Sequence, residues 1–381
     1  MNNISAFIKC SNCGACYNSC PKSAISVVSD MFYKLTVDED KCIDCGLCQK
    51  VCPVNTPQMH QNLKSAYTGY HIESEIVKNS SSGGAFAAIA DYVLHELNGV
   101  VYAAAYTENC REVVIKSTEQ VLLSSLMKSK YVESKVELSF KDLKEKLLAG
   151  RTVLFSGAPC QVAGLKRYLG KDYENLYTCD FSCEGMPSHQ TYQEYLNGIE
   201  KKLKSKIVSV DFRAKLYGWS RHSVRIIGKN GRQYKNFALS DPYFYSFIGK
   251  CVNIKEYCLS CDFSNNHYAD IILADFWGYA KYSKVKSDDT GLSLVITNSE
   301  KGEQLMGNIA PKFVTTVLDL KKASYNMKPR TPDKEFLKKR NNFFEHCRKE
   351  GFLKTMEKVK MPAKIKLKYR YIMSKLKEHI R

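Results

Sequence analysis

Between about residues 66 and 298, segments whose apolar residues follow a strand pattern alternate with segments whose apolar residues follow a helix pattern. Continuous apolar runs such as VVYAAAY (100–106) and LYTCDF (176–181) are typical of strands that are buried on both faces. Between such runs, segments such as 85–97 and 189–203 place apolar residues three and four positions apart, which predicts amphipathic helices. This rhythm predicts an α/β fold with helices on both sides of a mostly parallel or mixed sheet.

Two later stretches depart from the rhythm. Residues 210–237 are rich in β-branched and aromatic residues, and Asn230-Gly231 predicts a hairpin turn within them. After Asn298 the chain becomes charged and poor in turn residues. We therefore predict a helical C-terminal part that ends in a basic helical tail.

Cysteine spacing sets the beginning of the chain apart. Two blocks, CSNCGACYNSCP (10–21) and CIDCGLCQKVCP (42–53), both read C-x2-C-x2-C-x3-C-P. This is the spacing of bacterial ferredoxins that bind two [4Fe–4S] clusters. Zinc also binds CxxC pairs, but zinc ribbons use two pairs and not a repeated quartet that ends in Cys-Pro. The blocks therefore predict an N-terminal α+β ferredoxin-like dicluster domain.

The duplicated ferredoxin pattern also predicts which cysteines share a cluster. Three cysteines of each block bind one cluster, and the fourth binds the cluster of the other block. The predicted ligands of the first cluster are Cys10, Cys13, Cys16 and Cys52. The predicted ligands of the second cluster are Cys20, Cys42, Cys45 and Cys48.

Composition narrows the number of domains and the cellular compartment. The chain has 381 residues, 44% of them hydrophobic, which is enough for two or three domains with sizeable cores. No apolar run reaches the roughly 18 residues that span a bilayer, and no apolar signal segment precedes the first cluster ligand, Cys10. Because many of the sixteen cysteines serve as metal ligands, we expect a reducing, cytoplasmic compartment.

The net charge of +18 is uneven, and the tail is much more basic than the rest of the chain. From Lys354 onward, Glu357 and Glu378 are the only acidic residues. Apolar residues recur there at roughly helical spacing, namely Leu367, Tyr371, Ile372 and Leu376. We expect a peripheral contact with the inner membrane face or with an acidic protein, the alternative being a helix packed on its own domain. No nucleic-acid motif accompanies the charge, so we expect no nucleic-acid partner.

Four further cysteines suggest a third metal centre. Cys160 and Cys183 each follow a predicted strand, and ligands gather beyond the carboxyl ends of strands in α/β sheets. Cys258 and Cys261 form a CxxC pair. If these residues converge, they make a four-thiolate site for a third [4Fe–4S] cluster. Zinc, or buried thiols that only pack, remain alternatives.

Two segments are candidates for binding an anionic cofactor. Ser81 and Ser82 can cap a helix that starts near Gly84, while Gly83 and Gly84 would let a ligand approach the backbone. A simple cap and turn is the alternative. Lys130 and Tyr131, in MKSKYVESK, would meet a phosphate and a ring, or would face water.

Several motifs in one order resemble the coenzyme F-420 hydrogenase/dehydrogenase beta-subunit family. They are SSGGAF, KSKYVES, VLFSGAPCQVAGLKRYLG, CDFSCEGMPS, FRAKLYGW, CLSCDF with ADIILADFWG, and GLSLVITN, spread over residues 64–300. The resemblance implies a flavoprotein with FAD and a [4Fe–4S] cluster in the catalytic part. It implies cluster ligands at Cys160, Cys183, Cys258 and Cys261. It also implies a flavin pocket that includes Ser82, Gly83, Gly84, Lys130 and Tyr131.

One residue departs from the family pattern. Where members commonly have Cys-His-Gly, this chain has Cys183-Glu184-Gly185. We expect Glu184 to take over acid–base work, because a carboxyl can do so when burial raises its pKa. Lys130 is the second expected catalytic residue.

These observations give a division of the chain and an expected function. The predicted parts are a ferredoxin domain (1–62), a flavin-binding segment (64–143), a part with the third cluster (144–300) and a helical basic tail (301–381). The expected function is an oxidoreductase that passes electrons from a ferredoxin- or deazaflavin-type donor through the clusters to FAD and a substrate. That substrate is a small molecule or a glycan precursor, because similar bacterial proteins are encoded among polysaccharide-synthesis enzymes. The alternative is a non-catalytic electron-transfer subunit that docks to a partner enzyme.

Overall fold

A computed structural model describes residues 9–55, 62–277, 279, 288–323 and 332–362. Within these ranges, none of the helices combines the length and the apolar character needed to cross a bilayer. The predicted apolar stripe of the tail lies outside the described residues.

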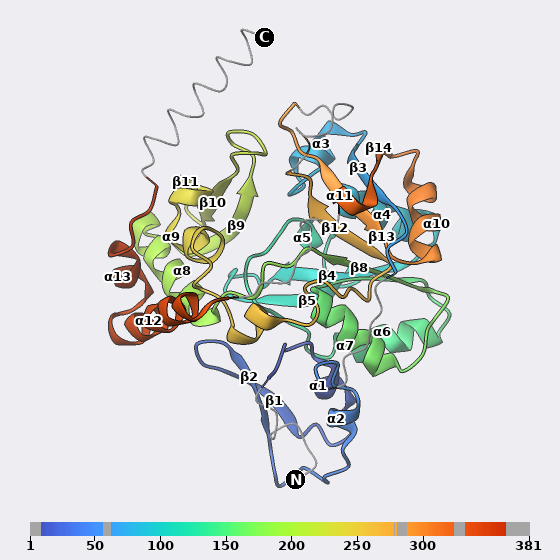
Figure 1. The fold of residues 1–381 in the computed structure, drawn as a ribbon, viewed down its shortest axis with the longest axis horizontal. Helices are drawn as coiled ribbons and strands as arrows, with labels where there is room; N and C mark the ends of the chain where they lie inside the picture. The colour runs from blue at the N-terminus through green and yellow to red at the C-terminus, as the bar shows by residue number, and fades with distance from the viewer. Residues whose placement is uncertain (1–8, 56–61, 278, 280–287, 324–331, 363–381) are drawn as a thin grey trace.

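The first part contains two short helices and a hairpin (Figure 1). The helices are α1 (Ala15–Ser19) and α2 (Leu47–Lys50), and the hairpin joins β1 (Ile25–Ser29) to β2 (Tyr33–Val37). Each helix follows a glycine with a positive φ, 84° at Gly14 and 72° at Gly46, where a side chain would be strained. The two cysteine blocks are therefore folded around matching turns, as expected for a duplicated ferredoxin unit.

A nine-stranded mixed sheet forms the centre of the described structure. Its order is β14-β3-β13-β12-β8-β7-β4-β5-β6. Its four central strands, β12, β8, β7 and β4, run parallel, and antiparallel pairs lie on both sides of them. The strands are β3 (Ala66–His71), β4 (Val100–Tyr106), β5 (Val113–Ser117), β6 (Ser134–Lys135), β7 (Val153–Ser156), β8 (Leu176–Phe181), β12 (Ile271–Asp275), β13 (Ser293–Thr297) and β14 (Phe313–Leu318).

Helices cover both faces of this sheet, because its central strands are apolar on both sides. Val153 and Phe155 of β7 share one core with α6 and α7, whereas Leu154 shares another core with α4 and α10. The helices of this part are α3 (Ser74–Lys78), α4 (Ala85–Asp91) with a π-helical extension (Tyr92–Glu96), α5 (Leu123–Leu126), α6 (Ser139–Leu148), α7 (Pro159–Leu169), α10 (Glu300–Ile309) and α11 (Leu320–Ala323). The predicted α/β class with a mixed sheet is confirmed.

A second, three-stranded antiparallel sheet forms a lobe beside the large sheet (Figure 1). The predicted hairpin is present, with Ile227 paired to Gln233 around the Asn230-Gly231 turn. Its strands are β9 (Ile207–Ala214), β10 (Ser223–Gly228) and β11 (Gln233–Phe237). The accompanying helical segments are α8 (His189–Leu203), the 3-10 turn Ala238–Ser240, α9 (Pro242–Phe244) with a π-helical turn (Tyr245–Gly249), a 3-10 turn (Glu256–Ser260), α12 (Lys334–Glu350) and α13 (Phe352–Glu357).

The part after Asn298 is not helical throughout, which corrects one expectation. The β-branched segment FVTTVL forms β14 and pairs with β3 over its whole length, from Phe313↔His71 to Leu318↔Ala66. The remaining described elements of this part are helices, as predicted.

Candidate functional site

The structure brings the ferredoxin cysteines together in the predicted crossed arrangement. Cys52, of the second block, interacts electrostatically with three cysteines of the first block. We call this group the inner quartet: Cys10, Cys13, Cys16 and Cys52. The other four line one small cavity, and we call them the outer quartet: Cys20, Cys42, Cys45 and Cys48. Backbone N–H groups point at sulfur in both, from Asn12 to Cys10 (3.4 Å) and from Ala24 to Cys20 (3.3 Å).

The four scattered cysteines also converge, at one end of the parallel strands. Cys160 begins α7 after β7, and Cys183 follows β8. The sulfur of Cys160 interacts electrostatically with the other three cysteines of this group. We call the group the cavity quartet: Cys160, Cys183, Cys258 and Cys261. Backbone N–H groups of Gly185 and Phe263 lie 3.4 Å from the sulfurs of Cys183 and Cys261.

These thiols are poorly placed to ionise on their own. Burial, with neighbouring cysteines, raises the pKa of Cys160 well above its usual range and that of Cys13 to about 12. A positively charged metal centre removes this penalty, because a coordinating thiol is deprotonated outright. Within the described ranges, no group of three or more His, Cys, Asp or Glu side chains is arranged around a single metal ion. Four converging thiols, with N–H groups aimed at sulfur, fit the ligand set of a [4Fe–4S] cluster.

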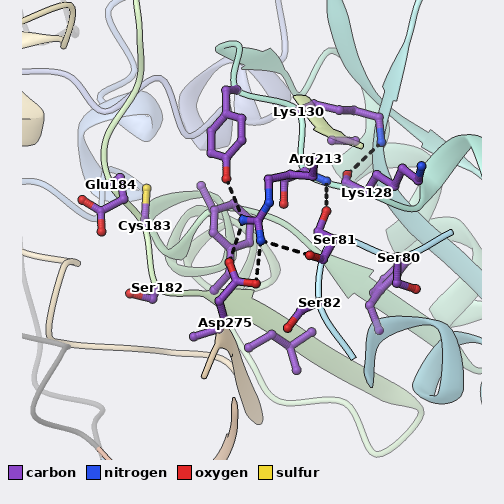
Figure 2. Close-up of a pocket in the computed structure, with 18 of the residues that line it drawn as sticks. Ser80, Ser81, Ser82, Lys128, Lys130, Ser182, Cys183, Glu184, Arg213 and Asp275 are labelled. Carbon is purple, nitrogen blue, oxygen red and sulfur yellow. Dashed lines mark hydrogen bonds and ion pairs between the residues drawn. The ribbon is translucent and has the colours of Figure 1, made fainter. Parts of the chain in front are cut away.

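A cavity of about 1090 Å³ lies beyond the carboxyl ends of β7, β8 and β12. Ser156, Phe181 and Asp275, the last residues of these strands, all line it. Cys183 lines it as well, so one member of the cavity quartet forms part of its wall. Figure 2 shows Cys183 and Glu184 on one side of the cavity, with Ser81, Lys128 and Lys130 on the other. The position agrees with the rule that α/β sheets bind ligands at these strand ends.

Most of the predicted cofactor and catalytic residues meet in this cavity. Its lining includes Ser82, Gly84, Lys130, Tyr131 and Glu184.

Gly83 is the exception, and its predicted role needs correction. It is not among the lining residues, and a Cβ on it would lie 2.3 Å from the carbonyl oxygen of Gly69 and 2.7 Å from the backbone nitrogen of Ser293. Its backbone N–H donates to the hydroxyl of Ser293 (3.0 Å). Gly83 therefore allows the turn to pack on the sheet and does not make room for a ligand.

The predicted serine caps are also absent. The residue at the start of α4 is Gly84, with φ 93° and no side-chain cap. The hydroxyl of Ser81 instead accepts from the N–H of Ser129 (2.7 Å), and that of Ser82 donates to the carbonyl of Leu292 (2.5 Å). These bonds tie the serine turn to the KSKY segment and to the sheet.

Arg213 holds several walls of the cavity together, although no role was predicted for it. Its guanidinium donates two bonds to Asp275, at 2.7 and 2.8 Å, and single bonds to the hydroxyl of Tyr131 (3.1 Å) and the carbonyl of Ser81 (3.0 Å) (Figure 2). The indole N–H of Trp219 donates to the same carboxylate (2.9 Å). Arg213 is 3% exposed and Asp275 is half-buried at the cavity wall, so the ion pair is bidentate and buried on the arginine side.

Tryptophan and histidine rings complete the same wall. Trp277 lines the cavity and stacks on Trp219 with a centroid distance of 4.4 Å. His222 also lines it, and burial together with the charge of Arg213 lowers its pKa to about 3. His222 is therefore a neutral ring at physiological pH.

Lys130 is a strongly perturbed base in the cavity. Its ammonium donates to the carbonyls of Met127 (2.7 Å) and Lys128 (3.2 Å). The side chain is half-buried, but its amine end is enclosed, and this burial lowers its pKa from 10.5 to about 7. Burial lowers the pKa of Lys215, which donates to the carbonyl of Ser82, to about 8. An amine with a pKa near neutrality can both give and take a proton.

The residues that sequence reasoning missed carried a usable signal. Arg213 lies near the end of β9, and Asp275 is the last residue of β12. The strand-end rule that selected Cys160 and Cys183 selects Asp275 equally well. The pairing of Arg213 with Asp275 had no such signal, because it depends on how the small sheet lies against the large one.

Two family models match the chain. Residues 150–322 match the model that describes the C-terminal part of the beta subunit of coenzyme F420 hydrogenase/dehydrogenase, and residues 9–56 match a 4Fe-4S dicluster domain. No curated protein matches the chain. Among solved structures, a chain from the F420-reducing [NiFe] hydrogenase complex of Methanosarcina barkeri is similar at 16% identity and a TM-score of 0.46. That similarity covers 77% of this chain and 95% of that one.

The two family matches account for the elements just described. The dicluster match contains all eight cysteines of the inner and outer quartets, and the beta-subunit match contains all four of the cavity quartet. The chain therefore carries a 4Fe-4S dicluster domain at its N-terminal side and, over residues 150–322, a region that matches the C-terminal part of the coenzyme F420 hydrogenase/dehydrogenase beta subunit.

Proposed function

We propose that the chain is an oxidoreductase that binds FAD in the large cavity and a third [4Fe–4S] cluster at the cavity quartet. The observation that carries this proposal is the position of Cys183, which belongs to the quartet and also lines the cavity. A cluster held there would be next to a cofactor bound in the cavity. Electrons would then reach the cofactor from the ferredoxin side without crossing solvent.

The cavity fits a large, partly aromatic anion. Its volume of about 1090 Å³ is at the upper limit of the usual ligand pocket, about 300–1,000 Å³, and leaves room for a substrate. Tyr131, Phe244 and Trp277 offer flat rings on which an isoalloxazine can stack. Lys128 and Lys130 line the cavity beside the serine turn and would lie near a phosphate bound there.

FAD accepts electrons one at a time and delivers them as a hydride, which is the chemistry that the cofactor would supply. The chain would supply proton transfer and exclusion of water. The amine of Lys130, with a pKa of about 7, can hold or release a proton at the cavity wall. The carboxyl of Glu184 lines the same cavity next to Cys183 and is the second candidate for acid–base work, although the residue is exposed and lacks the burial that was expected to tune it.

The donor and the substrate class rest on the family resemblance. We propose a one-electron donor protein such as ferredoxin, or a deazaflavin coenzyme, as the external redox partner. The substrate would be a small molecule that enters the free part of the cavity, and a glycan precursor of polysaccharide biosynthesis is the class that we favour. A non-catalytic subunit that only docks to a partner enzyme would not need a cavity that accommodates both a cofactor and a second ligand.

Paired cysteine variants test this function. Anaerobically reconstituted protein should contain about twelve irons, four for each quartet. Replacing Cys258 and Cys261 together by serine should remove about one third of the iron and leave the dicluster signals intact. As a matched control, serine at the buried Cys110 and Cys347 should leave iron unchanged.

Flavin is quantified on the same samples. The proposal expects about one FAD per chain in the wild-type protein. Unchanged iron in the Cys258/Cys261 variant would refute the third cluster. The absence of any stoichiometric flavin after reconstitution with FAD would refute the cofactor.

A further inference from the structure

The ferredoxin part is packed firmly against the rest of the chain. Helix α1 contacts both α6 and α7 (Figure 1). The side-chain amide of Asn18 donates to the carbonyl of Glu137 (2.7 Å), and its oxygen accepts from the N–H of Lys141 (3.3 Å). Cys13 and Ala15 belong to the same apolar core as α7. The ferredoxin part and the rest of the chain thus share a core and are not joined only by the connecting segment.

A buried ion pair reinforces the same seam. The carboxylate of Glu133, which is 1% exposed, accepts from the amide of Asn12 (2.6 Å), the N–H of Tyr33 (3.3 Å) and the ammonium of Lys255 (3.2 Å). Asn12 and Tyr33 belong to the ferredoxin part, whereas Glu133 and Lys255 belong to the rest. A charge buried to this degree is stable only while its partners stay in place, so the pair fixes the relative position of the two parts.

Two of the three quartets meet across this seam. The sulfur of Cys160 interacts electrostatically with Cys13 and lies 3.8 Å from the carbonyl oxygen of Ser11. Helix α1 also contacts α2, which carries Cys48 of the outer quartet, on the side away from α7 (Figure 1). Cys45 of the outer quartet is exposed. The order in space is therefore outer quartet, inner quartet, cavity quartet and cavity.

The close approach of the inner quartet to α7 depends on a glycine. Gly164 lies inside α7, and a Cβ built on it would be 2.8 Å from both the Cβ and the sulfur of Cys13. An ordinary contact at that position needs at least 3.4 Å, so any side chain would displace the inner quartet by about 0.6 Å or more. Gly14 also lies at the seam, and a Cβ built on it would be 2.6 Å from the Cβ of Val136.

We propose that the inner quartet holds the cluster that exchanges electrons directly with the cavity quartet, and that Gly164 is the positioning residue for this exchange. One electron leaves the inner cluster, which is oxidised, and reduces the cavity cluster by one electron, with no proton transferred. The outer quartet receives the electron from an external one-electron reductant. This inference rests on the proposed third cluster.

Electron paramagnetic resonance of dithionite-reduced protein tests the order. In a Cys45→Ser variant that has lost the outer cluster, the two remaining clusters should show a magnetic interaction. In a Cys13→Ser variant that has lost the inner cluster, the remaining two should give separate, uncoupled signals. Iron analysis of each variant establishes which clusters are present.

Gly164 is tested in the Cys45→Ser background. Gly164→Leu should weaken or abolish the interaction while iron stays at the level of the parent. Gly307→Leu is the matched control, because Gly307 also lies within a helix, α10, and has open space around its Cβ position. Gly307→Leu should leave the interaction unchanged.

The outcomes separate the inference from the proposed function. Wild-type protein with about eight irons would remove the third cluster, and with it both proposals. About twelve irons, with coupling that survives Cys13→Ser and disappears in Cys45→Ser, would overturn the order alone. If Gly164→Leu does not fold, the Cys45→Ser and Cys13→Ser pair still decides the order.

Discussion

Lys130 offers the most quantitative test of the cavity. Burial lowers the pKa of its ammonium from 10.5 to about 7. Each pKa unit corresponds to about 1.4 kcal/mol, so this shift is equivalent to about 5 kcal/mol between the charged and neutral amine. At pH 7 about half of the amines should be neutral, compared with about 0.03% for an unperturbed lysine.

Two neighbours should move this pKa in opposite directions. The carboxylate of Asp211 favours the charged amine, and the ammonium of Lys128 opposes it. Those two residues form an ion pair at 2.7 Å. Asp211→Asn should therefore lower the pKa of Lys130 further, and Lys128→Met should raise it.

The same shift affects stability with a definite sign. In the unfolded chain the pKa returns to 10.5, so between pH 7 and 10.5 the unfolded state binds a proton that the folded state does not. The contribution of Lys130 to the free energy of unfolding therefore falls as the pH falls from 10.5 to 7. Lys130→Met removes this dependence, so its free energy of unfolding relative to the wild-type protein should be highest at pH 7 and below.

The assay is competitive acylation of flavin-free protein, with each lysine followed by mass spectrometry across the pH range. Only the neutral amine reacts, so the midpoint of labelling reports the pKa. We expect a midpoint near 7 for Lys130 and near 10 for exposed lysines in the same digest. A midpoint for Lys130 equal to that of the exposed lysines, or shifts of the same sign in both neighbour variants, would refute the electrostatic account of the cavity.

Three further predictions concern the cavity and the tail. The two tryptophans of the chain stack on each other and Trp277 lines the cavity, so FAD binding should quench most of the tryptophan fluorescence, and a titration without quenching would place the flavin elsewhere. Arg213→Ala should cost about 3 kcal/mol of stability, the low end for a broken buried pair, because the partly exposed carboxylate of Asp275 loses its charged partner and keeps the bond from Trp219; melting curves should show this loss and none for the exposed Arg232→Ala. Deleting the residues after Pro362 should abolish co-sedimentation with anionic vesicles in about 0.1 M salt, where charges act over about 10 Å. Retained sedimentation would rule the tail out as the membrane contact.

The elements that were predicted well are those whose signal is local. The strand at Val100–Tyr106 and the helix at His189–Leu203 occur at the predicted bounds, because their apolar periodicity is long and uninterrupted. The cysteine quartets converge because their spacing, or their place after a strand, follows from the backbone path. β14 was missed because a single edge strand between helices carries only a short β-branched signal.

The residues that were predicted poorly depend on contacts between distant segments. Gly83 looked like part of a ligand loop, yet its space is taken by Gly69, which belongs to β3. Arg213 and Glu133 were given no role, because their partners are 62 and 121 residues away along the chain. Contacts between such distant residues cannot be predicted from the local sequence pattern, because they form only when the sheets and the ferredoxin part pack together.

A reductive titration tests the central claim most directly. The account assigns one electron to each of three clusters and two to FAD, so anaerobic dithionite should deliver about five electrons per chain and bleach the flavin band. The Cys258→Ser/Cys261→Ser variant should take up about four. An uptake of about two electrons by the reconstituted wild-type protein, with no flavin band, would show a ferredoxin-type carrier alone and would contradict the account.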